Sequence, residues 1–305
     1  MDLHVSLVPG LLELKNPVMS AAGTFGSGLE YRPYGDITQL GGIITNGLTL
    51  RPCMGSPMPR VAETPSGLLT SIGMQNDGAE YFIREVLPQL PWREVPIIPN
   101  INADLVDEFS ELAAILAAEQ GVAALEINLS CRNANRSGQR FNQNPVTAAR
   151  AVSAVKKAAG NKPVIAKLSP QILDIVEVAR SVEAAGADII SCIGTVQGLA
   201  VDVRERRAML GSITGGLSGP AVKPMALRCV WQISQAVDIP VIGVGGIRSA
   251  LDVLEFLLVG AHAVSVGSAS FSDPETIFRI VNELPAVCEE YGISDLREFR
   301  ASMKV

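Results

Sequence analysis

The amino-acid sequence predicts an α/β protein built as a (β/α)8 TIM barrel, and three observations support this prediction. Eight short apolar runs rich in β-branched residues recur along the chain, and such runs are typical of parallel strands buried on both faces. Segments with apolar positions three and four residues apart lie between most of these runs. No G-x-G-x-x-G motif follows an early run, which weakens the alternative of an open dinucleotide-binding sheet.

The predicted elements follow one another along the chain, after an N-terminal hairpin that precedes residue 17. Strands are expected at residues 17–21, 42–46, 95–101, 124–130, 163–168, 187–193, 240–244 and 263–267. Helices are expected at residues 106–119, 145–159, 174–185, 223–236 and 250–258. Two longer connections, residues 47–77 and 195–220, are insertions that we expect to cover the C-terminal mouth of the barrel.

Composition limits the classes of protein that this chain can belong to. Hydrophobic residues make up 48% and charged residues 18%, which favours a large core and argues against disorder. Without a Pro/Gly/Ser-rich linker, residues 1–305 are predicted to form a single domain. The net charge of −6, with no basic run, argues against a nucleic-acid partner.

Location and metal content are predicted from short sequence patterns. The N-terminus does not resemble a signal peptide, and no apolar stretch approaches the roughly 20 residues that cross a bilayer. The five cysteines contain no CxxC pair, and the two histidines, His4 and His262, are interpreted as structural. We therefore expect a cytoplasmic protein without membrane attachment and without a metal site of its own.

Candidate site residues come from the predicted carboxyl ends of the strands, where barrels of this type place their active sites. Asn100 and Asn128 offer amide groups at two of these ends. Lys167 projects into an otherwise apolar barrel, where an ammonium needs an anionic partner. That partner is predicted to be the N1/O2 edge of a reduced flavin or, alternatively, an acidic neighbour at the barrel mouth.

Small residues predict where a flat ring and a phosphate could approach the backbone. Ala21, Ala22 and Gly23 follow the first strand and leave room for a ring. Backbone N–H groups after the last two strands are the usual phosphate donors in these barrels. The residues expected there are Gly245, Gly246, Gly267 and Ser268.

Cys131 is the candidate proton-transfer residue, because it follows a buried strand and opens a polar segment. That segment, residues 132–144, contains three arginines and is expected to act as a lid. A thiol near arginines has a lowered pKa and can remove a proton at neutral pH. The alternative is an inert buried cysteine.

The sequence resembles the class 1 dihydroorotate dehydrogenases, most closely the class 1B catalytic subunit, over nearly its whole length. The motifs that carry the resemblance are NPVMSAAGTFGSG, PRVAETPSGLL, IGMQN, EINLSC, VIAKLSP, TGGLSGPAVKP, PVIGVGGI and VSVGSASF. The resemblance implies bound FMN and oxidation of dihydroorotate to orotate in pyrimidine biosynthesis. Cys131 is then the catalytic base, hydride passes to flavin N5, and Lys167 stabilises the reduced flavin.

The resemblance also implies binding residues and partners. The cofactor set gains Asn46, Ile193 and Gly219. The implied substrate set is Asn46, Thr70, Ile72, Gly73, Met74, Asn128, Asn133, Gly194 and Thr195. Class 1 relatives are homodimers, and the class 1B type pairs with a second subunit that carries FAD and a 2Fe–2S cluster and uses NAD+.

Four positions depart from the family pattern. Asn46 replaces a usual lysine, Thr70 and Gly194 replace asparagines, and Arg132 replaces the proline after the cysteine. A lost hydrogen bond to a charged group costs about 1.5–3 kcal/mol, so dihydroorotate would bind more weakly unless Arg132 compensates. The alternative is therefore a paralogous FMN dehydrogenase or reductase for another cyclic or unsaturated small molecule.

Two further classes of function remain as alternatives. A flavin-binding subunit without catalysis would not require Cys131, so replacing that residue would leave it unaffected. A phosphosugar isomerase on the same fold would need a carboxylate base at a strand end, and none of the predicted strand ends carries one.

Overall fold

The computed structural model describes residues 1–130, 141, 144–172 and 174–304. Eight parallel strands form a nearly closed barrel in the order β3-β16-β15-β10-β9-β8-β7-β4, and a bridge between Met19 and Gly42 joins the two edge strands. All eight predicted barrel strands are confirmed. They are β3 (Val18–Ser20), β4 (Ile43–Leu48), β7 (Ile97–Ile101), β8 (Leu125–Asn128), β9 (Val164–Leu168), β10 (Ile189–Cys192), β15 (Val241–Val244) and β16 (Ala263–Val266).

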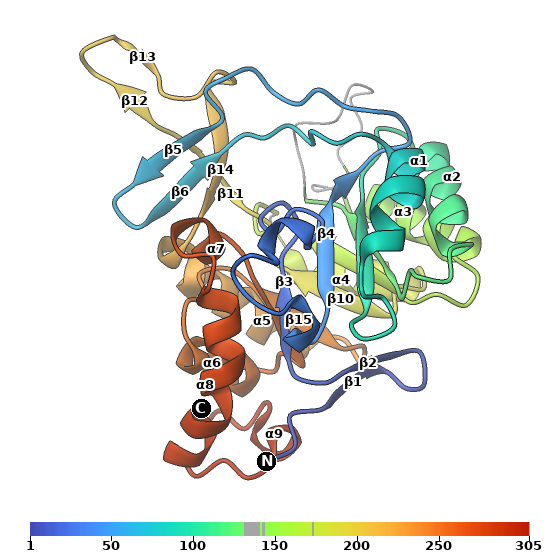
Figure 1. Cartoon of the computed structure of the whole chain (residues 1–305), viewed down its shortest axis with the longest axis vertical. Coiled ribbons are helices and arrows are strands. Elements are labelled where there is room, and N and C mark those ends of the chain that lie inside the picture. Colours follow the sequence, from blue (N-terminus) through green and yellow to red (C-terminus); the bar gives the residue numbers. More distant parts are fainter. Residues whose placement is uncertain (131–140, 142–143, 173, 305) are drawn as a thin grey trace.

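Helices surround the barrel, and the five predicted ones are present (Figure 1). They are α2 (Val106–Ala117), α3 (Pro145–Ala158), α4 (Ile175–Ala184), α5 (Lys223–Ser234) and α6 (Ala250–Leu258). Local caps explain several of their starts. The side chain of Asn144 accepts backbone N–H groups at the start of α3, and Asp174 does the same for α4.

The largest helix that the sequence analysis missed is α8 (Thr276–Glu290). It contains Pro285, a residue that normally ends a helix, although the side chain of Pro285 is exposed here. Buried apolar residues such as Phe278 and Leu284 attach α8 to the barrel. Shorter helical turns are α1 (Ala79–Tyr81), α7 (Ala269–Ser272), α9 (Leu296–Phe299), η1 (Leu29–Tyr31), η2 (Ile37–Gln39), η3 (Phe82–Val86), η4 (Leu87–Gln89) and η5 (Pro220–Val222).

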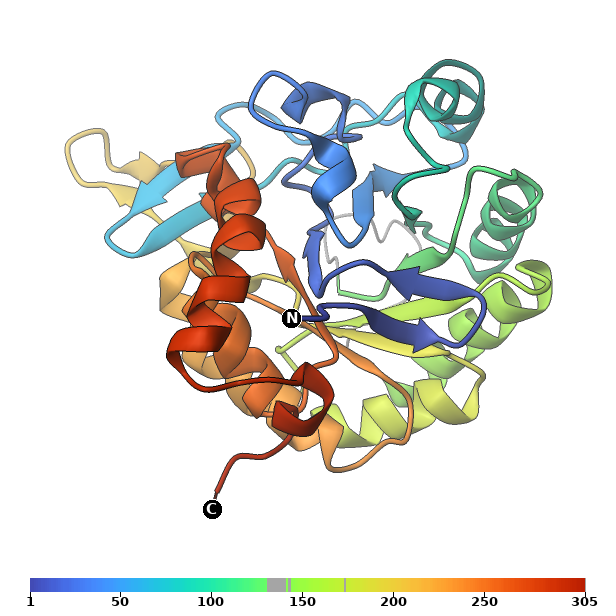
Figure 2. The same cartoon turned by 60° about the horizontal axis from the view of Figure 1, so that its bottom comes forward.

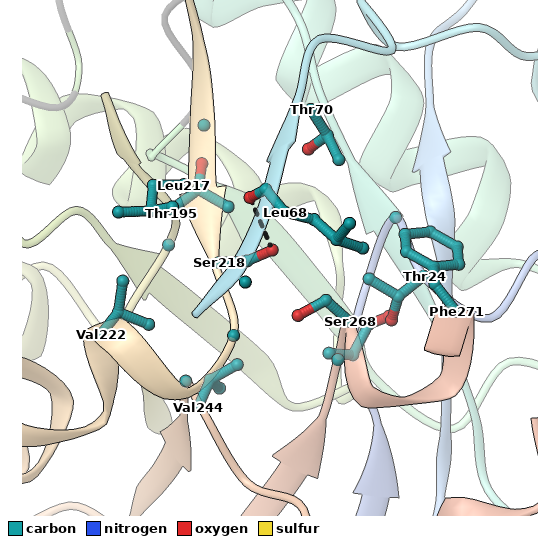
Figure 3. Close-up of a pocket in the computed structure, with 18 of the residues that line it drawn as sticks. Thr24, Leu68, Thr70, Thr195, Leu217, Ser218, Val222, Val244, Ser268 and Phe271 are labelled. Carbon is teal, nitrogen blue, oxygen red and sulfur yellow. Dashed lines mark hydrogen bonds between the residues drawn. The ribbon is translucent and has the colours of Figure 1, made fainter. Parts of the chain in front are cut away.

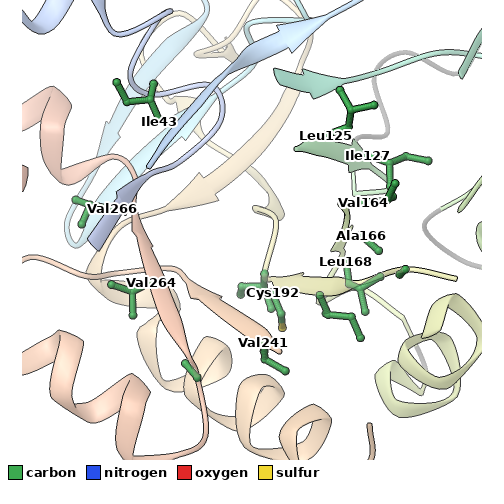
Figure 4. Packing of buried hydrophobic residues seen from close by; sticks show 14 of the residues in the cluster. Ile43, Leu125, Ile127, Val164, Ala166, Leu168, Cys192, Val241, Val264 and Val266 are labelled. Carbon is green, nitrogen blue, oxygen red and sulfur yellow. The ribbon is translucent and has the colours of Figure 1, made fainter. Parts of the chain in front are cut away.

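Alternate residues of each strand face opposite sides, as the pleat requires. Those facing outward belong to the larger buried cluster, which also contains residues of the surrounding helices; Leu125, Ile127 and Val164 are examples (Figure 4). Those facing inward fill the lower half of the barrel with apolar side chains. The members of this inner cluster on the barrel strands include Met19, Ile44, Ile98, Ile165, Ile189, Ile242 and Ala263.

The N-terminal hairpin closes the bottom of the barrel. Its strands are β1 (Val5–Val8) and β2 (Leu12–Leu14), which pair antiparallel. Leu7, Leu12 and Leu14 are buried in the same cluster as the inward-facing isoleucines. Figure 2 shows the hairpin in front of the strands. Solvent is therefore excluded from this end, and the opposite end remains available for a site.

The two long insertions form a small antiparallel sheet at the C-terminal end, in the order β11-β14-β6-β5 (Figure 1). Its strands are β5 (Val61–Thr64), β6 (Gly67–Thr70), β11 (Val196–Leu199) and β14 (Thr214–Ser218). A hairpin of β12 (Val201–Asp202) and β13 (Arg207–Ala208) projects beyond it. The predicted insertions over the mouth are thus confirmed. Across the described part of the chain, none of the helices is both long and apolar enough to span a bilayer.

Candidate active site

A cavity of about 680 Å³ lies between the C-terminal ends of the barrel strands and the insertion sheet. This volume is within the range of ordinary cofactor and small-molecule sites. Figure 3 shows Leu68 and Thr70 reaching it from β6, with Ser268 and Thr24 from the barrel strand ends. The insertions therefore supply one wall of the cavity, and the barrel supplies the other.

Glycine turns build one side of this cavity. Gly219, Gly245 and Gly246 have φ values of 99°, 129° and 78°, in the region that favours glycine. A Cβ atom on Gly246 would lie 2.7 Å from Cβ of Lys223 and 3.0 Å from the carbonyl oxygen of Gly219. The turns after β14 and β15 are therefore packed directly against each other.

Gly267 differs from those glycines, because its neighbours among the described residues do not require a glycine there. Its ideal Cβ would make only ordinary contacts, 3.7 Å from Ala21 and 3.8 Å from Thr24. Gly267 lines the cavity. Its missing side chain leaves the cavity floor low between β3 and β16, as a flat ligand requires.

The side chain of Asp252 fixes the turn after β15 through hydrogen bonds. Its carboxylate accepts backbone N–H groups of Arg248 and Ser249 at 2.8 and 2.9 Å, and the Lys223 ammonium at 2.6 Å. Burial of the Asp252 carboxyl opposes ionisation, but the hydrogen bonds from Lys223 and the backbone outweigh it and lower its pKa. Lys223 also pairs with Glu255 at 2.8 Å, which ties α5 to α6.

A chain of polar side chains runs along the opposite part of the cavity floor. The amide of Asn128 accepts a hydrogen bond from the Ser130 hydroxyl at 2.9 Å and donates to Asn100 at 3.3 Å. The amide of Asn100 donates to the Glu126 carboxylate at 2.6 Å. The Lys167 ammonium contacts the same Glu126 oxygen at 3.4 Å. Ser130, Asn128, Asn100 and Lys167 line the cavity, and Glu126 lies beneath them.

The prediction of an otherwise apolar barrel around Lys167 was wrong. Glu126, Ser191 and Ser265 are also buried on barrel strands. Each stands two residues after an apolar member of the inner cluster, so the pleat directs it to the same interior. Of the two partners proposed for Lys167, the structure contains the acidic neighbour, Glu126. The signal was present in the sequence, because Glu126 lies two residues before Asn128.

Asn46 is a second difference from the sequence analysis. The register of β4 against β7 shifts between Ile44 and Gly47, so that Gly47 rather than Asn46 lies opposite Asn100. Gly47 lines the cavity, and Asn46 is not among the lining residues. The Asn46 side-chain oxygen is buried without a hydrogen-bond partner among the described residues. Simple alternation along a strand does not anticipate such an irregularity.

The other predicted site residues that the structure describes meet at this cavity. From the cofactor set they are Ala21, Ala22, Gly23, Asn100, Asn128, Lys167, Ile193, Gly219, Gly245, Gly246, Gly267 and Ser268. From the substrate set they are Thr70, Ile72, Gly73, Met74, Asn128, Gly194 and Thr195. Cys131, Arg132 and Asn133 lie outside the described residues.

Sequence reasoning missed several lining residues that come from the insertions and the rim. Leu68, Leu217 and Ser218 belong to the insertion sheet, and Arg248 and Arg279 stand on the barrel side. Only the pairing of β6 with β14 brings Leu68 beside Ser218. These two strands lie far apart in the sequence, so local patterns carried no signal for their meeting.

Comparison with known proteins gives consistent matches along the whole chain. The profile of the dihydroorotate dehydrogenase family matches residues 5–288. A protein of Solidesulfovibrio magneticus is 57% identical over 304 residues, which are 100% of this chain and 99% of the relative. A protein of Maridesulfovibrio salexigens is 53% identical over 303 residues, 99% of each chain. Both are named dihydroorotate dehydrogenase B (NAD(+)), catalytic subunit.

A solved structure also matches. The dihydroorotate dehydrogenase of Eimeria tenella, in complex with ferulenol, superposes with a TM-score of 0.80. The match covers 99% of this chain and 88% of the other, at 20% sequence identity. At that identity the likeness supports the barrel fold and nothing finer.

Proposed function

Because the chain belongs to the dihydroorotate dehydrogenase family, we propose that it is the FMN-binding catalytic subunit of a class 1B enzyme that oxidises dihydroorotate to orotate. The observation that carries this proposal is the buried Lys167 ammonium on the floor of a cavity that small residues and glycine turns also line. In this proposal residues 1–305 act as one FMN-binding domain.

The described residues fit FMN. Ala21, Ala22 and Gly267 leave a shallow floor for a flat ring, and the ammonium of Lys167 stands at that floor. The turn at Gly245 and Gly246 follows the seventh barrel strand, where such barrels usually bind phosphate, and Gly219 packs against that turn. Further members of the proposed cofactor set at this cavity are Gly23, Asn100, Asn128, Ile193 and Ser268. Bound FMN supplies the hydride acceptor.

The chain supplies the base and the surroundings of the substrate. We assign Cys131 as the base that removes a proton from dihydroorotate, directly after Ser130, whose hydroxyl Asn128 holds at 2.9 Å. A buried cation near the ring stabilises the anion that forms on reduction, and Lys167 has that role. The proposed substrate residues among those described are Thr70, Ile72, Gly73, Met74, Asn128, Gly194 and Thr195. The set proposed from the sequence also includes Asn46 and Asn133.

The choice of dihydroorotate over another small cyclic substrate rests on the relatives. A relative that is 57% identical over the full length of this chain carries the dihydroorotate dehydrogenase name. This favours dihydroorotate despite Thr70 and Gly194. An ideal Cβ on Gly194 would lie 2.5 Å from the Ser130 side chain. A side chain at position 194 would therefore collide with Ser130, and glycine avoids this collision.

Electron transfer requires a partner in this proposal. The relatives are named catalytic subunits of an NAD(+)-dependent enzyme. We propose a second subunit that carries FAD and a 2Fe–2S cluster, bound to a homodimer of this chain. The described cysteines, Cys53, Cys192, Cys229 and Cys288, are free thiols, which suits the reducing cytoplasm as the proposed location.

The test is anaerobic mixing of the purified flavoprotein with excess dihydroorotate while the flavin absorption band is followed. We expect rapid bleaching. No bleaching, from protein whose flavin dithionite does reduce, would contradict the dihydroorotate assignment. Cys131→Ser should abolish reduction by dihydroorotate at neutral pH and leave reduction by dithionite unchanged.

A further inference from the structure

Glu126 is a buried carboxylate that the proposed chemistry does not yet use. It is completely buried on β8, between Asn100 and Lys167. Its Oε1 accepts both hydrogen bonds, and Oε2 has no hydrogen-bond partner among the described residues. A buried charge is costly unless it is paired. Burial of this carboxylate costs free energy of folding, and its place directly beneath the cavity floor points to a role in the site.

The hydrogen-bond pattern gives Glu126 control over two amides. A carboxylate only accepts hydrogen bonds, so Asn100 must turn its NH₂ group toward Glu126. The carbonyl oxygen of Asn100 then faces the NH₂ group of Asn128, and the Asn128 oxygen faces Ser130. The Glu126 acceptor thus sets the direction of both amides, Asn100 and Asn128, and this hydrogen-bond chain ends at Ser130, the residue before Cys131.

The contact with Lys167 is looser than the contact with Asn100. The Lys167 ammonium lies 3.4 Å from Glu126 Oε1, and the Asn100 amide lies 2.6 Å from the same atom. Charge-assisted pairs in direct contact usually measure about 2.7–2.9 Å. Glu126 therefore offsets the charge of Lys167 without holding the ammonium tightly, so that Lys167 can also donate into the cavity that it lines.

We propose that Glu126 is a positioning residue that sets the reduction potential of bound FMN through Lys167 and the Asn100–Asn128 amides. The inference rests on the FMN-binding function proposed above. The Glu126 carboxylate, 3.4 Å from the Lys167 ammonium, offsets its charge, so reduced anionic flavin gains less from Lys167 than it would from an uncompensated cation. Glu126 therefore holds the potential low, which favours passing electrons onward.

The test is a dye-coupled redox titration of FMN bound to Glu126→Gln. The substituted amide keeps the shape and removes the charge. We expect the oxidised-to-reduced equilibrium to shift at least tenfold toward reduced flavin, about 30 mV for a two-electron couple. The control is Ser191→Ala, which removes a hydroxyl buried in the same barrel without a hydrogen-bond partner among the described residues. Its potential should equal that of the unsubstituted protein.

A potential for Glu126→Gln that equals that of Ser191→Ala, or that moves downward, would overturn the proposal. Dihydroorotate is not used in the titration, so a wrong substrate assignment leaves the result valid. If the unsubstituted protein bound no FMN, the proposed function itself would fail first and separately.

If the Glu126→Gln protein binds no flavin, a second measurement tests the proposal without the cofactor. Thermal unfolding of the flavin-free proteins compares Glu126→Gln, Lys167→Met and the double variant. A functional pair predicts a lowered Tm in each single variant and recovery in the double variant, because a buried charge without its partner destabilises more than a neutral pair. Additive losses would show that Glu126 does not act with Lys167, and would overturn the proposal.

Discussion

The lower and upper halves of the barrel interior are built on the same strands and differ in chemistry. Ile98, Ile165 and Ile189 fill the lower half against the N-terminal hairpin. Two residues further along the same strands stand Asn100, Lys167 and Ser191. Burial of each isoleucine contributes about 1.5–3 kcal/mol to folding, whereas burial of the polar residues is costly. The apolar lower half of the barrel thus stabilises the fold, and this stabilisation offsets the cost of burying polar groups in the upper half.

The largest expected effect on stability comes from the lower half. Ile165→Ala should lower the free energy of unfolding by about 3 kcal/mol, because Ile165 is completely buried and a cavity would remain. Urea unfolding of the flavin-free protein measures this loss. Val146→Ala, on the exposed side of α3, is the control and should change stability by about 0.5 kcal/mol or less. A shift in flavin potential in Ile165→Ala would contradict the division between the two halves.

The second prediction concerns His262, which precedes β16 on the lower side. Burial, with a smaller contribution from Arg300, lowers the pKa of His262 from 6.5 to about 4. The unfolded chain then binds the proton more readily than the folded chain between these values. Stability should therefore fall as pH decreases from 6.5 toward 4, by up to about 3 kcal/mol from this group.

Urea unfolding at a series of pH values checks this expectation. His262→Asn can still accept the backbone N–H of Val241, which His262 Nδ1 accepts at 3.3 Å, and it does not titrate. Its stability should vary less between pH 6.5 and 4 than that of the unsubstituted protein. Equal pH dependence in the two proteins would exclude His262 as the cause.

The third prediction concerns the support of the turn after β15. Asp252→Asn should lower stability by about 1–2 kcal/mol at pH 7, because the Lys223 pair weakens while Lys223 retains Glu255. Because the pKa of Asp252 is lowered in the folded protein, the difference in stability between the unsubstituted protein and Asp252→Asn should narrow as pH falls below the ordinary value of 3.8. FMN affinity should fall as well. A stability loss with unchanged affinity would separate Asp252 from the proposed phosphate turn.

The smallest expected effect compares two glycines. Gly267→Ala should weaken FMN binding about tenfold, or about 1.4 kcal/mol, without lowering the stability of the flavin-free protein. Gly243→Ala should lower the stability of the flavin-free protein and leave FMN binding unchanged. Its Cβ would lie 2.3 Å from Phe256, on the helix-facing side of β15. Fluorescence titration with FMN and urea unfolding measure the two quantities. Loss of stability in Gly267→Ala would show that the cavity floor is part of the core.

Sequence reasoning reached the barrel, its eight strands and most of the cavity lining, because these depend on local patterns. Each barrel strand is a short apolar run, and each strand end carries its polar or small residue within two or three positions. The helix α8 escaped notice because Pro285 interrupts its pattern, although tertiary packing of Phe278 and Leu284 outweighs that preference.

What the sequence by itself determined is therefore the order of strands and helices, the family and the identity of most groups at the mouth. Only the tertiary structure decided which groups meet. The β4 irregularity placed Gly47 opposite Asn100, and strand pairing brought Leu68 beside Ser218. The same packing placed Glu126 between Asn100 and Lys167. Such contacts join residues on different strands. Alternation along one strand shows which side a residue faces, but the register between strands decides which residue it meets.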